Sequence, residues 1–208
     1  MEHEISLALP NDSHALVRAW LTRQAHTTFT RSTMLLNVYF DTPAFDLKRQ
    51  KAALRLRFDS ERSCWIQTLK TAGERVNGVH VRHEWESVLP QTLSTSADIV
   101  PMFQTHDFSA DAQSFLHGFL TELRPVFRTD FTREIYDFEH DGQHFEWAFD
   151  DGAVVRMDAA AQTAIHELEL EYKSGNLELM RQMADQAQMA LHAQAQILSK
   201  AARGYALI

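Results

Sequence analysis

Three stretches of the sequence alternate charged and apolar residues, and this alternation constrains the fold more than any other feature. The stretches are Glu2–Ile5, Leu54–Phe58 and Glu167–Glu171. Because the side chains of a strand point alternately to opposite faces, each stretch predicts a strand with one charged and one apolar face. Acidic residues on two of these strands and an arginine pair on the third suggest a surface that binds divalent cations beside a polyanion.

The composition narrows the class of protein. Hydrophobic residues make up 45% and charged residues 23% of the 208 residues, which is typical of a globular domain. We expect one domain over residues 1–208, with no additional helical domain. Apolar runs are shorter than the roughly 18 residues of a membrane-spanning helix and no leader pattern opens the chain, which predicts a cytoplasmic protein without a membrane partner. The pattern does not distinguish a monomer from a homodimer.

Charge and side-chain chemistry exclude some kinds of site. The net charge of -8 disfavours a nucleic-acid partner, although a local basic cluster can still bind a small anion. A single cysteine, Cys64, excludes an internal disulfide and a cysteine-built zinc site. No pair of histidines has the H-E-x-x-H pattern of a helical zinc-protease site, so we expect structural or surface roles for the histidines.

Turn residues and hydrophobic periodicity divide the chain into about eight strands and three helices. Amphipathic helices are expected after Ser13, from about Phe115 to Leu123, and over residues 177–202. Hairpin turns are expected at Asp141-Gly142 and at Asp151-Gly152. The expected strands are residues 2–9, 34–40, 52–58, 63–70, 80–88, 127–138, 143–150, 153–157 and 165–172.

Sequential hairpins favour an antiparallel sheet, and about eight strands can close into a barrel. Alternation alone leaves open which face points inward, since a common small barrel keeps its apolar residues inside and its charges in water. Three amphipathic helices need an apolar surface to cover. We therefore expect an α+β fold: an eight-stranded antiparallel β-barrel with a polar lumen, flanked by about three helices.

Six segments resemble a known family when they are taken together and in order. The chain resembles the triphosphate tunnel metalloenzymes, also called CYTH domain proteins, and is most similar to their bacterial inorganic triphosphatases. The match reaches from the N-terminal region to the last few residues. The segments are Leu35–Pro43, Leu54–Arg57, Thr68–Gly73, Phe127–Phe131 with Arg133, Glu167–Glu171 and Leu198–Tyr205.

The resemblance implies an eight-stranded tunnel in which basic side chains bind a triphosphate and acidic side chains hold Mg²⁺ or Mn²⁺. The family includes inorganic triphosphatases, thiamine triphosphatases, RNA triphosphatases and class IV adenylate cyclases. Inorganic triphosphate, or another triphosphate, is therefore the expected small-molecule partner.

Carboxylates two residues apart on a strand share a face and can converge on a hard cation, which prefers oxygen ligands. For each acid the alternative is an ion pair with an arginine of the lumen, and Glu84 and Glu167 are expected to have that structural role. The predicted metal ligands are Glu2, Glu4, Asp150, Glu169 and Glu171.

Arginine forks and lysine point charges suit nonbridging phosphate oxygens. Arg128 and Arg133 differ in strand parity, so a uniform strand cannot point both inward, and the resemblance favours Arg133. Arg203 is expected either to contact the substrate or to brace the last helix. Lys70 and Glu4 are the predicted catalytic residues. The predicted substrate-binding residues are Arg55, Arg57, Lys70, Arg82, Arg133, Lys200 and Arg203.

The sequence departs from the family at its first motif. The family pattern is Glu-x-Glu-x-Lys, whereas the matching residues here are Glu2, Glu4 and Ser6. Ser6 is neutral and cannot supply the cation that helps to activate water or to position the phosphate. Activation then falls to Lys70 or to the metal, and the enzyme is slow, or else the protein binds a triphosphate without turnover.

The leading hypothesis is a metal-dependent hydrolase that cleaves inorganic triphosphate to diphosphate and phosphate. The alternatives are another triphosphate reaction of the family, on thiamine triphosphate or a nucleoside triphosphate, including a class IV adenylate cyclase. A non-catalytic triphosphate- or polyphosphate-binding protein is the third hypothesis, and it is motivated by Ser6.

Overall fold

The computed structural model describes residues 2–59, 62–71, 73–89 and 108–208. Within these ranges the chain forms eleven strands and five α-helices, with a short 3-10 helix at Leu120–Glu122. The strands are β1 (Glu2–Ala8), β2 (Thr27–Asp41), β3 (Ala53–Asp59), β4 (Cys64–Lys70), β5 (Glu74–Val76), β6 (Val79–Arg82), β7 (Glu84–Leu89), β8 (Arg124–His140), β9 (Gln143–Arg156), β10 (Gln162–Ser174) and β11 (Gln194–Ala195). The helices are α1 (His14–Leu21), α2 (Asp46–Arg49), α3 (Ala110–Leu116), α4 (Leu177–Ala190) and α5 (Lys200–Tyr205).

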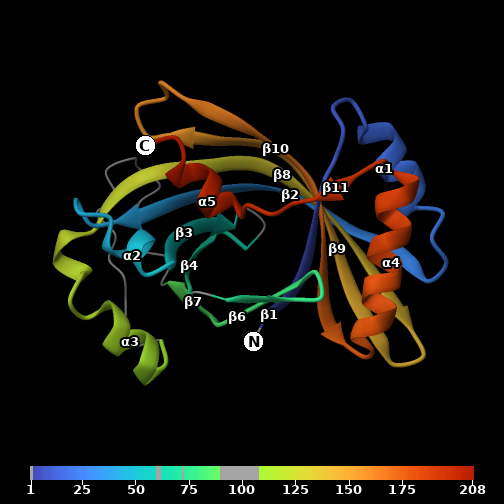
Figure 1. Cartoon of the computed structure of the whole chain (residues 1–208), viewed down its shortest axis with the longest axis horizontal. Coiled ribbons are helices and arrows are strands. Elements are labelled where there is room, and N and C mark those ends of the chain that lie inside the picture. The colour runs from blue at the N-terminus through green and yellow to red at the C-terminus, as the bar shows by residue number, and fades with distance from the viewer. Residues whose placement is uncertain (1, 60–61, 72, 90–107) are drawn as a thin grey trace.

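The described strands form one curled antiparallel sheet (Figure 1). Its order is β5-β6-β1-β10-β9-β8-β2-β3-β4-β7, and β11 adds to β1. Short connections join four neighbouring pairs, which are β3-β4, β5-β6, β8-β9 and β9-β10. The strand β8 makes the longest pairings of the sheet, with β2 on one side and β9 on the other.

One bent segment joins the two ends of this sheet. Residues 80–88, which are expected as a single strand, belong to β6 and β7, and only His83 separates these two strands. β6 pairs with β1, whereas β7 pairs with β4. Counted as one bent strand, β6 and β7 complete a ring of eight strands that the covalent chain closes. The expected eight-stranded antiparallel barrel is therefore confirmed.

The apolar strand faces lie outside, beneath helices. Val17 of α1 and Met180 of α4 pack with Trp147 of β9 in one buried cluster. On the other side of the molecule, α3 packs over Leu54 of β3 and Leu69 of β4 (Figure 1). The expected arrangement, with helices over the apolar faces and charges within, is confirmed for these elements. In the described part of the chain, no helix has the length and apolar character needed to cross a membrane.

One end of the lumen is apolar, which the sequence does not predict. Leu35 of β2 and Phe131 of β8 pack there against Tyr205 of α5. Gly204 lets α5 approach, because a Cβ at this position would lie 2.1 Å from the ring of Phe127. The helix α5 therefore packs against the inner face, while α1, α3 and α4 cover the outside.

The expectation of one long helix over residues 177–202 is wrong. The helix α4 ends at Ala190, and the chain turns through His192, whose φ is 52°. It then forms β11, and the Gln196 amide donates to the Ser6 carbonyl at 2.8 Å. The continuous apolar pattern thus belongs to two helices, one outside and one inside, that are separated by an edge strand.

The turn expected at Asp151-Gly152 is also wrong. β9 runs through both residues without a break. A Cβ at position 152 would lie 2.2 Å from the Asp130 carbonyl oxygen of the neighbouring strand. Gly152 therefore serves the close approach of β8 and β9, which is the other common reason for glycine in a strand.

Candidate active site

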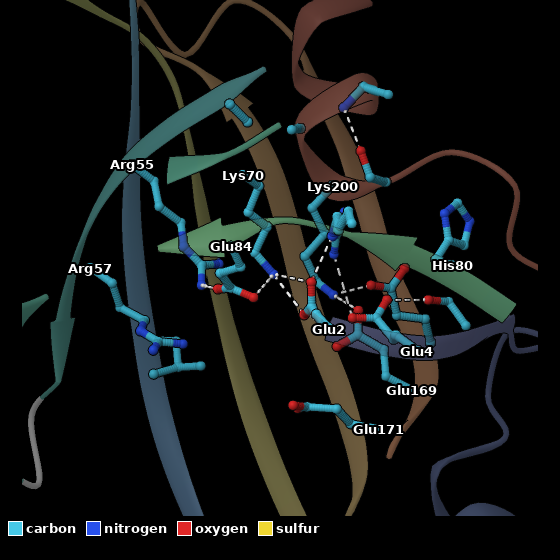
Figure 2. Close-up of a pocket in the computed structure, with 18 of the residues that line it drawn as sticks. Glu2, Glu4, Arg55, Arg57, Lys70, His80, Glu84, Glu169, Glu171 and Lys200 are labelled. Atoms are coloured by element: carbon cyan, nitrogen blue, oxygen red, sulfur yellow. Dashed lines mark hydrogen bonds and ion pairs between the residues drawn. The ribbon is translucent and has the colours of Figure 1, made fainter. Parts of the chain in front are cut away.

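The charged part of the inner face lines a cavity of about 740 Å³. Figure 2 shows its two sides: the arginines of β3 lie on one wall, and carboxylates from β1 and β10 lie on the other. Strand alternation explains the arrangement, because the charged residue of each alternating pair points inward. The cavity therefore places positive and negative groups on opposite walls.

Arg55 and Arg57 form the basic wall. Arg55 Nη2 lies 3.9 Å from Glu84 Oε1, and Arg57 Nη2 lies 3.2 Å from Glu86 Oε2. In the part of the chain that is described, neither arginine Nε has a hydrogen-bond partner. Burial, together with the neighbouring Arg55, lowers the pKa of Arg57 to about 10. Buried guanidinium groups with unused donors form a site for an anion.

Three carboxylates meet at the opposite wall, where Glu167 and Glu169 line the cavity and Asp150 is fully buried beside them. Asp150 and Glu167 are cross-strand partners on β9 and β10, and Glu169 lies two residues further along the same face. Each offers an oxygen within 4.8 Å of the other two. Lys200 Nζ lies 2.7 Å from both Asp150 Oδ2 and Glu169 Oε1, and it also contacts Glu167. Arg133 binds Asp150 through two hydrogen bonds, of 2.7 and 2.6 Å.

This packing shifts the pKa values of the group. Burial raises the pKa of the Glu169 carboxyl, but Lys200 and Arg133 outweigh burial and hold that pKa well below its usual range. For Glu167, burial prevails and its pKa is raised. Burial lowers the pKa of Lys200, yet Asp150 and the two glutamates raise it above its usual value. The acids of this wall thus depend on cations for their charged state.

The same three carboxylates fit a divalent cation. Mg²⁺ and similar hard ions take oxygen ligands and need only a few of them from the protein. Asp150, Glu167 and Glu169 offer carboxylate oxygens alone, and the position of Lys200 among them shows that positive charge is stabilised there. A bound metal ion would, together with Lys200, neutralise the negative charge of the three carboxylates.

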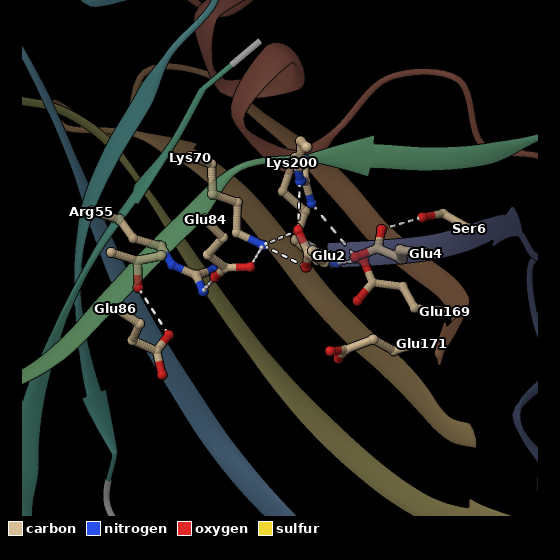
Figure 3. Close-up of polar contacts among 12 residues, drawn as sticks. Glu2, Glu4, Ser6, Arg55, Lys70, Glu84, Glu86, Glu169, Glu171 and Lys200 are labelled. Atoms are coloured by element: carbon tan, nitrogen blue, oxygen red, sulfur yellow. Dashed lines mark hydrogen bonds and ion pairs between the residues drawn. The ribbon is translucent and has the colours of Figure 1, made fainter. Parts of the chain in front are cut away.

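Glu2 is held by two cations. Lys70 Nζ donates to Glu2 Oε1 at 2.8 Å, and Arg82 Nε donates to Glu2 Oε2 at 2.7 Å. Lys70 also lies 3.1 Å from Glu84 Oε2, so it joins the basic and acidic walls (Figure 3). Burial raises the pKa of Glu2, but Lys70 and Arg82 outweigh burial and lower it far below its usual value. Glu2 is therefore a well-paired carboxylate.

Glu4 is compensated less well. Its nearest cation, Arg82 Nη2, lies 3.5 Å away, and Ser6 Oγ donates to Glu4 Oε1 at 2.7 Å (Figure 3). Burial and the nearby Glu169 raise the pKa of Glu4 to about 7. At the position of the family lysine, Ser6 supplies a hydroxyl where a cation would hold this carboxylate ionised. Desolvation and the nearby Glu169 therefore favour the neutral form of Glu4 more than that of an ordinary carboxyl.

Glu171 lies in the tunnel as the cross-strand partner of Glu4, but it is outside the compact group of Asp150, Glu167 and Glu169 (Figure 3). Lys173 Nζ lies 2.8 Å from Glu171 Oε1 and 3.7 Å from Glu146 Oε1. Burial raises the pKa of Glu171. This structure thus places Glu171 in a separate ion-pair group.

Two arginines differ from the other predicted cations. Arg203 Nη2 donates to Glu167 Oε2 at 2.5 Å, and its Nη1 donates to the Ala164 carbonyl at 3.1 Å, which braces α5 against β10. Arg128 is partly exposed and binds Asp130 at 2.7 Å. Its strand parity is opposite to that of Arg133, and the register of β8 with β9 shows no bulge between them.

Some contributors to the site are not predicted from the sequence. Glu167 is expected only as a structural partner, yet it belongs to the carboxylate group, and its shared strand face with Glu169 is the signal that could have indicated this. Lys48 and Lys51 line the same cavity from α2 and the residues after it. A short helix between two strands has no pattern that directs its lysines to a lumen.

The whole sequence bears a family relationship. Residues 1–205 match the CYTH domain family. The chain is 29% identical over 178 residues to an inorganic triphosphatase of Haemophilus influenzae, over 85% of this chain and 47% of that protein. The chain thus spans about half the length of that curated relative.

Solved structures share the fold. An adenylyl cyclase candidate from Hippeastrum with a dominant triphosphatase activity has a TM-score of 0.67 at 19% identity, over 99% of this chain and 96% of that one. An adenylate cyclase candidate from Bacillus halodurans has a TM-score of 0.60 at 16% identity, over 96% and 94% of the two chains. Since the family match covers nearly the whole sequence and the strands close around a charged lumen, the chain belongs to the CYTH domain family.

Proposed function

We propose that the protein hydrolyses inorganic triphosphate to diphosphate and phosphate when Mg²⁺ or Mn²⁺ is bound, with residues 1–208 acting as one tunnel domain. The observation that carries this proposal is the two-walled cavity. Arg55 and Arg57 offer unused donors on one wall, and carboxylates suited to a divalent cation lie on the other. Phosphoryl transfer asks mainly for positioning and charge neutralisation, and these walls supply both.

The relatives support the same reaction class. The Haemophilus influenzae protein is an inorganic triphosphatase, and the Hippeastrum protein has a dominant triphosphatase activity. The choice of inorganic triphosphate rests on the bacterial relative and on the highly charged cavity.

The basic side chains bind and orient the substrate. Arg55 and Arg57 receive nonbridging phosphate oxygens in their planar forks, each contact being worth roughly 4 kcal/mol at about 4 Å and an effective dielectric near 20. Lys70 lies between the walls, so it contacts the phosphate nearest the carboxylates. Arg82, Arg133 and Lys200 line the same cavity, pair with its carboxylates and complete the positive surroundings of the substrate.

Glu4 takes the proton of the attacking water. Its pKa of about 7 suits a general base at neutral pH. Asp150, Glu167 and Glu169 would hold the metal, which when bound supplies charge neutralisation at the phosphate oxygens. The assignments of Glu2, Glu4 and Glu171 as metal ligands stay predictions, because these carboxylates do not belong to the compact group of Asp150, Glu167 and Glu169 among the described residues.

The test is phosphate release from tripolyphosphate with Mg²⁺ or Mn²⁺, with a Glu4→Gln variant as the control. We expect release by the natural sequence, and release that is lower by at least tenfold in the variant. Equal release by the two proteins would contradict the proposal. Assays of ATP for cyclic AMP, and of thiamine and nucleoside triphosphates for phosphate, distinguish the other reactions of the family.

Ser6 favours a second candidate, a protein that binds triphosphate or polyphosphate without turnover. In the structure Ser6 contributes only a hydroxyl beside Glu4. This candidate predicts thermal stabilisation by tripolyphosphate without phosphate release. A Ser6→Lys variant separates the two candidates, because a large gain in its hydrolysis rate would identify the missing cation as the limiting part. Efficient hydrolysis by the natural sequence would exclude the binding-only role.

A further inference from the structure

A second cluster of chemically capable side chains lies on the outer face of the same two strands. The register of β9 and β10 pairs Asp151 with His166, directly beside the Asp150–Glu167 pair that faces the tunnel. Alternation sends the Asp151–His166 pair outward, where His14, the first residue of α1, meets it. Residues from α1, β9 and β10 thus form a group that is separate from the tunnel.

The geometry of this group is compact. His14 Nε2 and His166 Nδ1 each lie 2.9 Å from Asp151 Oδ1. One ligand atom from each residue lies within 4.8 Å of the other two. Ligands bound to one metal ion at about 2.0–2.1 Å lie roughly 3.3 Å apart in tetrahedral geometry, so a small expansion would admit an ion.

Ser13 gives an independent indication. It occupies the N-cap position of α1, where a serine hydroxyl usually accepts from the helix backbone, yet it makes no such bond. Its hydroxyl instead lies 3.0 Å from His166 Nε2, and the residue is buried. A hydrogen bond on the second ring nitrogen fixes the tautomer and orientation of a metal-binding histidine. Ser13 therefore holds His166 with Nδ1 directed at Asp151.

We propose that His14, Asp151 and His166 form a binding site for a divalent transition-metal ion of the Zn²⁺ class, which fastens α1 to the outer face of β9 and β10. Two imidazoles and one carboxylate suit Zn²⁺, Ni²⁺ or Co²⁺, whereas Mg²⁺ prefers oxygen ligands throughout. The exposed fractions are 39% for the His14 side chain, 45% for Asp151 and 10% for His166. Solvent can therefore reach the group and supply the remaining ligands.

The described residues around the three ligands do not oppose the positive charge of a bound metal ion. Arg18, the cation on the next turn of α1, is bound to Glu134 through its Nε and Nη2, so its charge is compensated. The rings of His14 and His166 both lie against Phe149, which limits their rotation. The two imidazoles are thus held close to the positions that a shared ion requires.

The test is titration of the full chain with Zn²⁺ in excess Mg²⁺, which occupies oxygen-only sites in the tunnel. Calorimetry gives the number of Zn²⁺ ions bound per chain. The melting temperature reports whether the ion stabilises the packing of α1 on the sheet, and the visible absorption of bound Co²⁺ reports ligation by imidazole. We expect one Zn²⁺ per chain, a higher melting temperature, and a Co²⁺ spectrum. His14→Ala and His166→Ala should each lose all three, while Ser13→Ala should weaken Zn²⁺ binding by roughly 10- to 100-fold.

His144→Ala is the matched control. The His144 side chain is 37% exposed and pairs with Asp137 at 3.2 Å, and it belongs to none of the candidate metal groups of the described residues. We expect this variant to bind Zn²⁺ as the natural sequence does. The site would be refuted if the natural sequence bound no Zn²⁺ in excess Mg²⁺, or if His14→Ala bound it unchanged; the three residues would then form only a hydrogen-bonded cluster. His14 is the more exposed histidine, so its replacement keeps the test valid even if His166→Ala fails to fold.

Discussion

Charged side chains of the lumen differ in how completely the chain itself pairs them. Glu2 and Asp150 accept short hydrogen bonds from two cations each. Arg57 and Glu4 have longer or weaker partners, and their pKa values are shifted in the direction that disfavours the charged form. Incomplete pairing of a buried charge costs folding free energy, and such groups are candidates for ligand contacts.

Arg57→Ala tests the anion site. We expect tripolyphosphate binding to weaken by about 1.5–3 kcal/mol, or roughly 10- to 150-fold, because a charge-assisted contact is lost. The melting temperature of the free protein should stay unchanged or rise, since Arg57 is buried without full compensation. Calorimetry and thermal unfolding measure both effects. Arg128→Ala, which removes an outer ion-paired arginine, is the control and should leave affinity unchanged.

The raised pKa of Glu4 predicts that the free energy of unfolding depends on pH when EDTA removes metal ions. The pKa of Glu4 is about 7 in the folded protein, against an ordinary value of 4.5. Between these values the folded state binds more protons than the unfolded state, so stability falls as the pH rises through this window. Urea unfolding at several pH values measures the slope. Glu4→Gln should flatten it, and an unchanged slope in this variant would show that another group is responsible.

At the scale of elements, strand periodicity was the most informative signal and helix continuity the least. The alternating stretches became β1, β3 and β10 with their charges inward, as expected. The pattern over residues 177–202 predicts one helix, because periodicity does not show where a chain leaves one surface for another. The glycine at position 152 predicts a turn, although glycine marks turns and close strand contacts alike.

Gly152→Ala tests the close contact of β8 and β9. The new methyl group would meet the Asp130 carbonyl and Phe131, so we expect a loss of about 1–3 kcal/mol in the free energy of unfolding. Gly118→Ala is the matched control, because nothing lies within 4 Å of its Cβ position and its φ is not positive. Urea denaturation of both variants measures the difference. Equal stability of the two would mean that β9 shifts to accept the methyl group.

At the scale of the whole molecule, Lys200 connects the tunnel to α5. Its Nζ contacts carboxylates of β9 and β10, and the rest of α5 closes the apolar end of the lumen. The acidic wall, the last helix and the basic wall thus form one continuous interior. Loading of the acidic wall with a cation should therefore influence the stability of the whole fold.

Lys200→Met tests this connection. Three buried carboxylates would lose a shared cation, which should destabilise the protein in EDTA by about 3–5 kcal/mol. Mg²⁺ or Mn²⁺ should restore more stability to this variant than to the natural sequence, because a metal ion can replace the missing charge. Lys51→Met, at an exposed lysine of the same cavity, should show neither effect. A variant with normal stability in EDTA would show that the ion pairs contribute nothing net.

Local patterning was sufficient to predict the barrel, its charged lumen and many of the charged residues that line it, because strand alternation and helix amphipathicity are properties of each element on its own. The order of the six motifs was sufficient to indicate the family, because each motif is a short local segment that can be recognised in the sequence. Pairing of the charges was decided only in three dimensions: the partners of Lys200, of Glu4 and of His166 come from strands and helices far apart in the sequence. Register, burial and the inward packing of α5 set those distances, and distances determine which carboxylates share a cation and which arginines keep donors for a ligand.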